Sequence, residues 1–335
     1  MRKRITLSLG LAMMTAALTA TMPAHAQPPS PATSPEPALG DPMPDRILTL
    51  ANGVTVSTDI TYSTISGYRP IILDLYRPAQ QDKPQQAGPL PLVIYIHGGG
   101  WANGHTRQSG AFSDFTAVLA DLSARGYVVA SLEYRLSKEA PFPAAIDDVR
   151  TAIRYLRANA QRFGLDGSHV AVWGGSAGGQ LAALAALQCG SAPTGDDKNN
   201  AGQSDCVQAG VGWYGVYDFA TMPQAIANAE NAYLDCIKPN CPADRIKAAS
   251  PAAHVDAKDP PMLLIHGTED KVVPADQSRQ LAAALKSAGV PVTLQIINGV
   301  GHSWIGADAA ATRDASLRAL DLTFRFFDTQ LKGKK

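Results

Sequence analysis

The sequence lacks any excess of charge of one sign. Its 335 residues carry 29 Lys and Arg against 29 Asp and Glu, so the formal net charge at neutral pH is zero. Neither nucleic acid nor an anionic membrane therefore has an electrostatic reason to bind this chain. Charged residues make up only 17% of the chain and hydrophobic residues 45%. This length and composition suffice for one large globular domain, and no internal repeat divides it.

The sequence also lacks the residue spacings of a metal site. No pair among its seven histidines has a separation typical of zinc ligands, and the four cysteines fit no zinc pattern. We therefore expect no metal, and none of the motifs described below requires a cofactor.

Long apolar runs are scarce, and the one at the N-terminus has the features of a targeting segment. Arg2, Lys3 and Arg4 precede an apolar stretch over 5–19, and Ala24-His25-Ala26 fits a small-x-small cleavage site. This predicts a signal peptide over residues 1–26. The run is too short and too interrupted for a membrane anchor, and no cysteine near the cleavage site could carry a lipid. We expect a periplasmic or secreted protein.

Residues 27–45 are rich in Pro, Ser and Ala and predict an extended linker. All four cysteines lie beyond this linker, and an oxidising compartment favours disulfides over free thiols. Four cysteines allow three pairings. Proximity along the chain favours Cys189–Cys206 and Cys236–Cys241.

Strand and helix patterns alternate over residues 46–335. The dense apolar run Leu90–Ile96 is typical of a strand buried on both faces. This alternation predicts one α/β domain with a mostly parallel central sheet and helices on both faces. We expect further strands at 54–57, 71–76, 127–132, 170–173, 210–216, 262–265 and 292–297, and helices at 111–124, 177–188 and 276–288. A helix from 144 should bury Ile146, Val149, Ile153 and Leu156, a cap should occupy 218–255, and a last helix should bury Leu317, Leu320, Phe324, Phe327 and Leu331.

Ser176 stands in a G-x-S-x-G motif with Gly174 and Gly178, between a short apolar strand and a helix. A serine at such a strand-to-helix turn has its hydroxyl lifted clear of the sheet, and the glycines allow the two backbones to approach. The helix N-terminus also favours developing negative charge at this point. The alternative interpretation is a glycine-rich structural turn with an incidental serine. The strand–turn–helix context favours a nucleophile.

Three consecutive glycines, Gly98, Gly99 and Gly100, follow the buried strand 90–96 and precede Trp101. Backbone N–H groups there are free to point into a site, as an oxyanion hole requires. A merely flexible loop would not need to abut a buried strand.

Two later strand ends supply candidate partners for Ser176. Asp270 follows the strand 262–265 and is the candidate acid, with Glu269 as its rival. His302 follows the strand 292–297 and is the candidate base. Carboxyl ends of parallel strands share one edge of a sheet, where such sites lie. The order Ser, Asp, His is that of α/β-hydrolases.

Taken together, these motifs resemble the α/β-hydrolase esterases of the hormone-sensitive-lipase and feruloyl/acetyl-xylan-esterase-like (BD-FAE-like) groups. The matching segments are 97–101, 134–136, 139–145, 174–179, 266–274 and 301–302. The resemblance implies Ser176 as nucleophile and the N–H groups of Gly99, Gly100 and Ala177 as the oxyanion hole. The block 136–139 departs from the hormone-sensitive-lipase form and that group's helical N-terminal cap is missing, which favours the BD-FAE-like branch. Kynurenine formamidase has a similar glycine element, but export argues against it.

The sequence therefore predicts a serine carboxylesterase in which Ser176 attacks an ester, His302 acts as base and Asp270 orients it. Trp101 and Trp304 flank the two site loops, and we expect their indoles to border the acyl pocket and restrict it to short chains. The substrate would be a small ester or a plant polysaccharide carrying acetyl or feruloyl groups. Two alternatives remain: an exported peptidase or amidase of the same fold, and a non-catalytic binding protein that retains the fold.

Overall fold

A central sheet organises the computed structural model, which describes residues 46–79, 88–190, 200–223 and 227–333. Residues 44–335 form one compact unit. The predicted signal peptide and linker lie outside the described residues. Within these, the sheet has nine strands in the order β1-β2-β3-β5-β4-β6-β7-β8-β9. The strands are β1 (Arg46–Thr49), β2 (Thr55–Ser63), β3 (Ile71–Arg77), β4 (Leu90–Ile96), β5 (Val128–Leu132), β6 (Leu165–Gly175), β7 (Ala209–Trp213), β8 (Met262–Gly267) and β9 (Val292–Ile297).

The sheet is mostly parallel, as the sequence predicts. Strands β5, β4, β6, β7, β8 and β9 pair in parallel, whereas β1, β2 and β3 form an antiparallel edge that joins β5. The parallel strands place their carboxyl ends along one edge. The loops after β4, β6, β8 and β9 therefore meet there.

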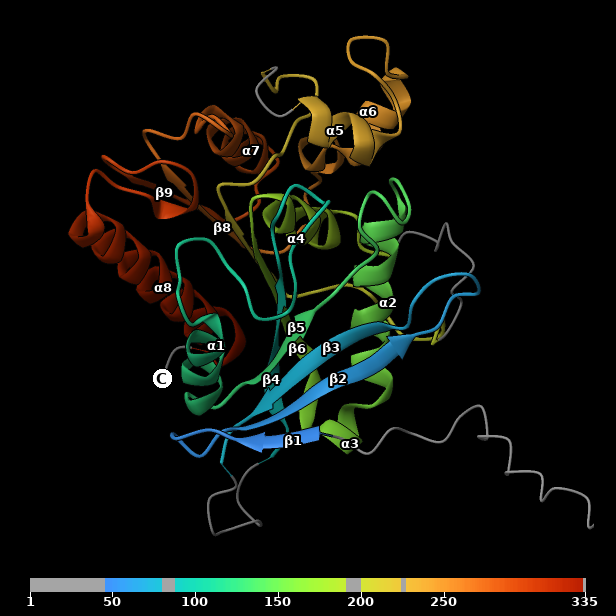
Figure 1. The fold of residues 1–335 in the computed structure, drawn as a ribbon, viewed down its shortest axis with the longest axis vertical. Coiled ribbons are helices and arrows are strands. Elements are labelled where there is room, and N and C mark those ends of the chain that lie inside the picture. Colours follow the sequence, from blue (N-terminus) through green and yellow to red (C-terminus); the bar gives the residue numbers. More distant parts are fainter. Residues whose placement is uncertain (1–45, 80–87, 191–199, 224–226, 334–335) are drawn as a thin grey trace, which may run out of the picture. The chain divides into compact units, whose positions relative to one another are not determined.

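Helices cover both faces of the sheet (Figure 1). One face packs against α1 (Phe115–Ala124) and α8 (Ala309–Leu331), and the other against α2 (Ala144–Ala158), α4 (Ala177–Leu187) and α7 (Asp276–Ser287). The short α3 (Ala160–Phe163) precedes β6, and α5 (Ala227–Leu234), α6 (Ala243–Ala249) and η2 (Pro251–His254) form the predicted cap. A last 3-10 turn, η3 (His302–Trp304), follows β9. None of the described helices is long and apolar enough to cross a membrane.

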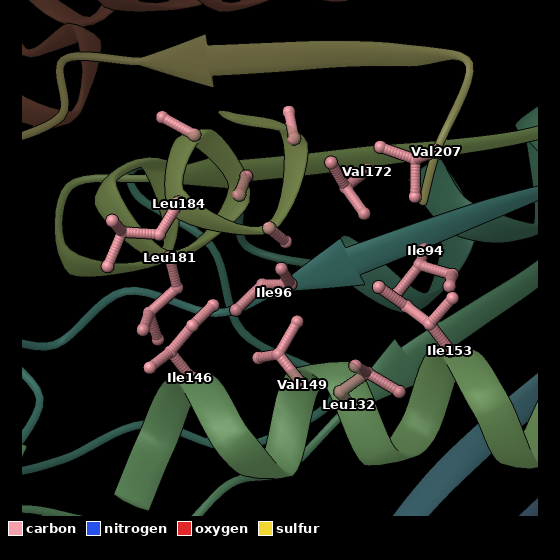
Figure 2. Packing of buried hydrophobic residues seen from close by; sticks show 14 of the residues in the cluster. Ile94, Ile96, Leu132, Ile146, Val149, Ile153, Val172, Leu181, Leu184 and Val207 are labelled. Atoms are coloured by element: carbon pink, nitrogen blue, oxygen red, sulfur yellow. The ribbon is translucent and has the colours of Figure 1, made fainter. Parts of the chain in front are cut away.

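The core between α2, α4 and the sheet follows the helical spacing in the sequence. Ile146, Val149 and Ile153 of α2 face Ile94, Ile96 and Leu132 of the sheet, with Leu181 and Leu184 of α4 beside them (Figure 2). All of these side chains are buried. Burial of each such side chain contributes roughly 1.5–3 kcal/mol, so this layer holds α4 firmly at the carboxyl edge of the sheet.

Two of the expected boundaries shift for local reasons. Helix α1 begins at Phe115 because the Asp114 carboxylate caps it, accepting the Ala117 N–H at 2.9 Å. Strand β7 ends at Trp213, where Tyr214 takes a positive φ of 36° and turns the chain.

In α8 the predicted burial of Leu317 is wrong, since this side chain is 47% exposed. The buried stripe runs instead through Ala315, Ala319 and Thr323, whose hydroxyl accepts the Trp213 indole N–H at 2.9 Å. The other four predicted positions are buried.

Two disulfides join the cysteines in the pairing that chain proximity favours, Cys189–Cys206 and Cys236–Cys241. The first connects the end of α4 to the segment before β7, where the Arg157 guanidinium donates to the carbonyl oxygens of Ser204 and Cys206. The second closes a short loop between α5 and α6. The paired-cysteine expectation is therefore confirmed.

Candidate active site

Ser176 lies at the turn between β6 and α4 in a backbone conformation that most residues avoid. Its φ is 57° and its ψ is −123°, and its N–H donates to the Trp213 carbonyl at 2.9 Å. A Cβ on Gly174 would lie 2.2 Å from the Gly178 carbonyl oxygen, and one on Gly178 would lie 2.1 Å from that of Ile96. The two glycines are thus required for the turn, which stores strain and presents the serine hydroxyl.

The structure brings Ser176, His302 and Asp270 together in one hydrogen-bonded chain. His302 Nε2 lies 2.9 Å from Ser176 Oγ, and His302 Nδ1 lies 2.8 Å from Asp270 Oδ2. Glu269, the rival acid, is exposed and accepts a hydrogen bond from the Thr268 hydroxyl instead. Of the two carboxylates, Asp270 is the one that meets the imidazole.

The surroundings of Asp270 keep it ionised. Burial alone would raise its pKa, but hydrogen bonds from His266 and His302, together with the Val273 N–H, hold the pKa well below its usual range. Its Oδ1 accepts the N–H groups of Val272 and Val273, each at 2.9 Å. Both oxygens are thus fixed, and Oδ2 faces the imidazole as a charged acceptor.

His266 is a contact of Asp270 that the sequence analysis missed. It is fully buried in β8, with Nε2 2.8 Å from the Val273 carbonyl oxygen and 3.2 Å from Asp270 Oδ2. Both neighbours only accept, so Nε2 carries the hydrogen, and Nδ1 lies 2.7 Å from the Ser278 hydroxyl. The spacing of four residues to Asp270, across the end of a strand, was the available signal.

We expect the substitution His266→Phe to lower kcat for ester hydrolysis about ten-fold with KM little changed, because a lost donor of one hydrogen bond to a charged group costs roughly 1.5–3 kcal/mol. An aromatic ring is retained, whereas the Nε2 donor to Asp270 and Val273 and the Nδ1 contact with Ser278 are lost. Ser278→Ala is the matched control, since it keeps the Nε2 donor. Steady-state kinetics of both variants, with thermal melting to verify folding, would contradict this role if the two lost activity equally.

A cavity of about 330 Å³ opens in front of Ser176 and His302. Gly99 and Gly100 line it with positive φ values of 104° and 61°, and a Cβ on Gly99 would lie 2.1 Å from the Asn103 carbonyl oxygen. Ala177 is the first residue of α4, so its N–H has no acceptor one turn back in the helix. These N–H groups can serve a developing oxyanion beside Ser176.

The glycine loop is anchored by His97, which is fully buried and stacks on Tyr134 with ring centroids 4.4 Å apart. Its Nδ1 lies 2.7 Å from the Gly98 carbonyl oxygen, and the Tyr134 hydroxyl donates to the His97 carbonyl at 3.0 Å. Burial lowers the pKa of His97 to about 4, against a weaker opposing effect of the Gly98 contact. His97 is therefore neutral at neutral pH and donates from Nδ1 to Gly98.

The expectation that Trp304 borders the acyl pocket is wrong. Its indole is 0% exposed, does not line the cavity, and packs against Trp213 and Tyr214 with centroids 5.4 and 4.7 Å away. Ser303 and Trp304 both have positive φ, a turn that places the ring in the hydrophobic core beside Trp213 of β7. In its place Tyr214 lines the cavity, with its ring 4.8 Å from that of His302.

Trp101 does line the cavity, but its indole is only 1% exposed. Its Nε1 donates to Gln180 Oε1 at 2.9 Å. The indole is thus packed in the interior and contributes almost no exposed surface to the cavity. Among the described residues, no group of three His, Cys, Asp or Glu side chains could hold a metal ion.

Known proteins resemble this chain over most of the described domain. The BD-FAE family model matches residues 73–285, more than half of the chain. Esterase LipC of Mycobacterium tuberculosis (strain H37Rv) is 34% identical over 246 residues, which are 72% of this chain and 59% of LipC. The chain thus spans less than two thirds of that relative's length.

Two solved structures share the fold at greater coverage. A truncated form of a carbohydrate esterase from gut microbiota has a TM-score of 0.68 and 28% identity, covering 87% of this chain and 99% of that one. An acetyl ester-xyloside bifunctional hydrolase from Caldicellulosiruptor lactoaceticus has a TM-score of 0.65 and 25% identity, covering 81% and 92%. The family match, the mostly parallel sheet and the strand-to-helix turn at Ser176 agree: the chain belongs to the BD-FAE family of α/β-hydrolases.

Proposed function

We propose that this protein is a serine carboxylesterase with Ser176 as nucleophile, His302 as general base and Asp270 as the acid that orients it. The observation that carries the proposal is the hydrogen-bonded chain from Asp270 Oδ2 through His302 to Ser176 Oγ, with distances of 2.8 and 2.9 Å. That chain opens into a cavity lined by the positive-φ glycines Gly99 and Gly100.

In the proposed mechanism, His302 Nε2 takes the Ser176 proton as Oγ attacks the ester carbonyl. The N–H groups of Gly99, Gly100 and Ala177 hold the oxyanion, and Asp270 stabilises the imidazolium. The protonated His302 then gives its proton to the leaving alcohol. Water, activated by the same imidazole, hydrolyses the acyl-enzyme and regenerates Ser176.

The size and lining of the cavity favour a short acyl group. Its volume of about 330 Å³ is near the lower end of ligand pockets. Acetyl groups on a plant polysaccharide are the substrate that best agrees with relatives described as a carbohydrate esterase and an acetyl ester-xyloside hydrolase. A feruloyl group is the larger candidate.

We expect kcat/KM on p-nitrophenyl esters to be greatest for acyl chains of about two to four carbons, because overpacking a cavity of this small volume costs about 1–3 kcal/mol. The measurement is a series from C2 to C16 on the purified protein, extended with acetylated xylan, methyl ferulate and a p-nitroanilide. A maximum at C10 or beyond would contradict the short-chain proposal. Faster cleavage of the anilide than of the matching ester would instead identify an amidase.

We also propose that the protein acts outside the cytoplasm, in the periplasm or after secretion. The two disulfides are compatible with an oxidising compartment, and the N-terminal sequence has the pattern of a cleaved signal. An intact mass of the exported protein that begins at residue 27 would support this proposal.

A further inference from the structure

The buried indole of Trp101 connects the glycine loop to the cap helix α5. Its ring stacks on Tyr233 of α5 with centroids 4.5 Å apart and planes 13° from parallel. Gln180 of α4 joins the same cluster, since its Oε1 accepts the Trp101 N–H at 2.9 Å and its Nε2 donates to the Ala249 carbonyl at 2.8 Å. A movement of α5 would therefore break contacts with both α4 and the loop that carries Gly99 and Gly100.

Further contacts hold α5 at its other sides. The buried Glu230 carboxylate pairs with Lys238 Nζ at 2.8 Å, and Lys238 lies inside the loop closed by Cys236–Cys241. The Tyr233 carbonyl accepts the Phe142 N–H at 2.7 Å. These contacts hold α5 in a fixed position beside the cavity.

Among the described residues of α5, Ala229 is the one that lines the cavity. It lines the cavity and is half-buried, next to the anchored Glu230. A Cβ built on Gly100 would lie 3.5 Å from the Ala229 Cβ, which is ordinary van der Waals contact. Ala229 thus lies beside a proposed oxyanion-hole glycine in the wall of the cavity. Any side chain larger than a methyl group would extend further into the cavity and reduce its volume.

The lining of the cavity includes both aliphatic and polar residues. Val216 and Val272 are the other aliphatic side chains that line it with Ala229, whereas Asn103, Gln108 and Ser109 supply polar groups from the loop after the glycines. An alkyl chain is favoured beside aliphatic side chains such as Ala229, and the hydroxyl-bearing alcohol of a sugar ester beside polar groups.

We infer that Ala229 is the specificity-determining residue for acyl length: its methyl group, packed beside Gly100 in the cavity wall, leaves the cavity in front of Ser176 open to a short acyl chain. This inference rests on the proposed esterase function. It replaces the earlier expectation of an indole wall, because Trp101 acts here through Tyr233, as the anchor of α5, and not as a surface for the acyl chain.

The test compares Ala229→Leu with Ala232→Leu, the same substitution at an exposed position one turn along the same helix. We expect Ala229→Leu to lower kcat/KM for p-nitrophenyl butyrate and hexanoate at least ten-fold more than for p-nitrophenyl acetate. Ala232→Leu should leave kcat/KM unchanged for all three esters. Ala229→Val, a smaller change, should also lower kcat/KM for butyrate and hexanoate more than for acetate, but by a smaller factor. This variant covers the case in which the Leu variant does not fold.

A second series keeps the acetyl group and varies the alcohol from methyl to naphthyl. Ala229→Leu should not change this series by more than two-fold. Equal loss on all acyl lengths, no loss on any, or discrimination among alcohols instead of acyl groups would overturn the inference while the esterase function stands. If the wild-type protein and Ser176→Ala hydrolyse esters equally slowly, the proposed function itself fails and the inference fails with it.

Discussion

Ser176→Ala is expected to lose about 10⁶-fold in turnover of p-nitrophenyl acetate, because loss of a triad nucleophile removes the covalent step altogether. The fold should persist. The side chain at this position is small, and the strained turn is defined by Gly174, Gly178 and the bond from the Ser176 N–H to the Trp213 carbonyl, all of which remain. Steady-state turnover with a burst-phase measurement and a thermal melt on each protein would test both statements.

Ser303→Ala is the appropriate control, since Ser303 also lines the cavity and directly follows His302. It lacks the hydrogen bond from Oγ to His302 Nε2 that Ser176 makes at 2.9 Å. We expect this control to lose less than ten-fold. A fluorophosphonate probe should label the wild type and Ser303→Ala but not Ser176→Ala. If Ser176→Ala retained a tenth of the wild-type turnover, Ser176 would not be the nucleophile.

The sequence predicted the features that depend on where strands end and on positions where only glycine fits. The limits of β4 and β9 agree with their apolar runs, and Ser176, Asp270 and His302 meet because each follows the carboxyl end of a parallel strand. Backbone geometry alone brings such positions together. For this reason three residues spread over 126 positions of the chain could be placed in one site from the sequence.

Side-chain direction after a strand end could not be predicted in the same way. Trp304 is two residues past His302, yet positive φ values at Ser303 and Trp304 place its indole in the core. Leu317 fits the helical spacing of α8, but the neighbouring elements cover the side that carries Ala315. In both cases tertiary packing decides, and periodicity gives no information on which edge of a stripe a neighbour will cover.

The contact of His266 with Asp270 likewise depends on a side-chain direction that the sequence does not determine. The sequence places both at the end of β8, but whether the imidazole faces the carboxylate depends on how the 267–273 turn folds back. In the structure the Val272 and Val273 N–H groups hold Asp270 Oδ1, which directs Oδ2 toward both histidines. The choice between Asp270 and Glu269, which the motif order favoured without deciding, follows from this turn.

That turn also determines what Asp270→Asn should do. Oδ1 accepts two backbone N–H groups, so the amide oxygen of Asn must take that place and its NH₂ must take the place of Oδ2. The NH₂ then faces His302 Nδ1 and His266 Nε2, two positions that Asp270 serves as an acceptor. His302 would become an acceptor at Nδ1 and carry its hydrogen on Nε2, where it cannot take the Ser176 proton.

We therefore expect Asp270→Asn to lower kcat on the order of 10⁴-fold, the effect of the wrong imidazole tautomer. Glu269→Gln is the matched control at the adjacent residue, with the same change of carboxylate to amide. Glu269 is exposed and contacts Thr268, so its substitution should change kcat less than two-fold. Parallel kinetics at several pH values, with melting curves, would distinguish the two. A greater loss for Glu269→Gln, or equal losses for both, would mean that Asp270 is not the acid and that the hydrogen bond to His302 does not serve the reaction.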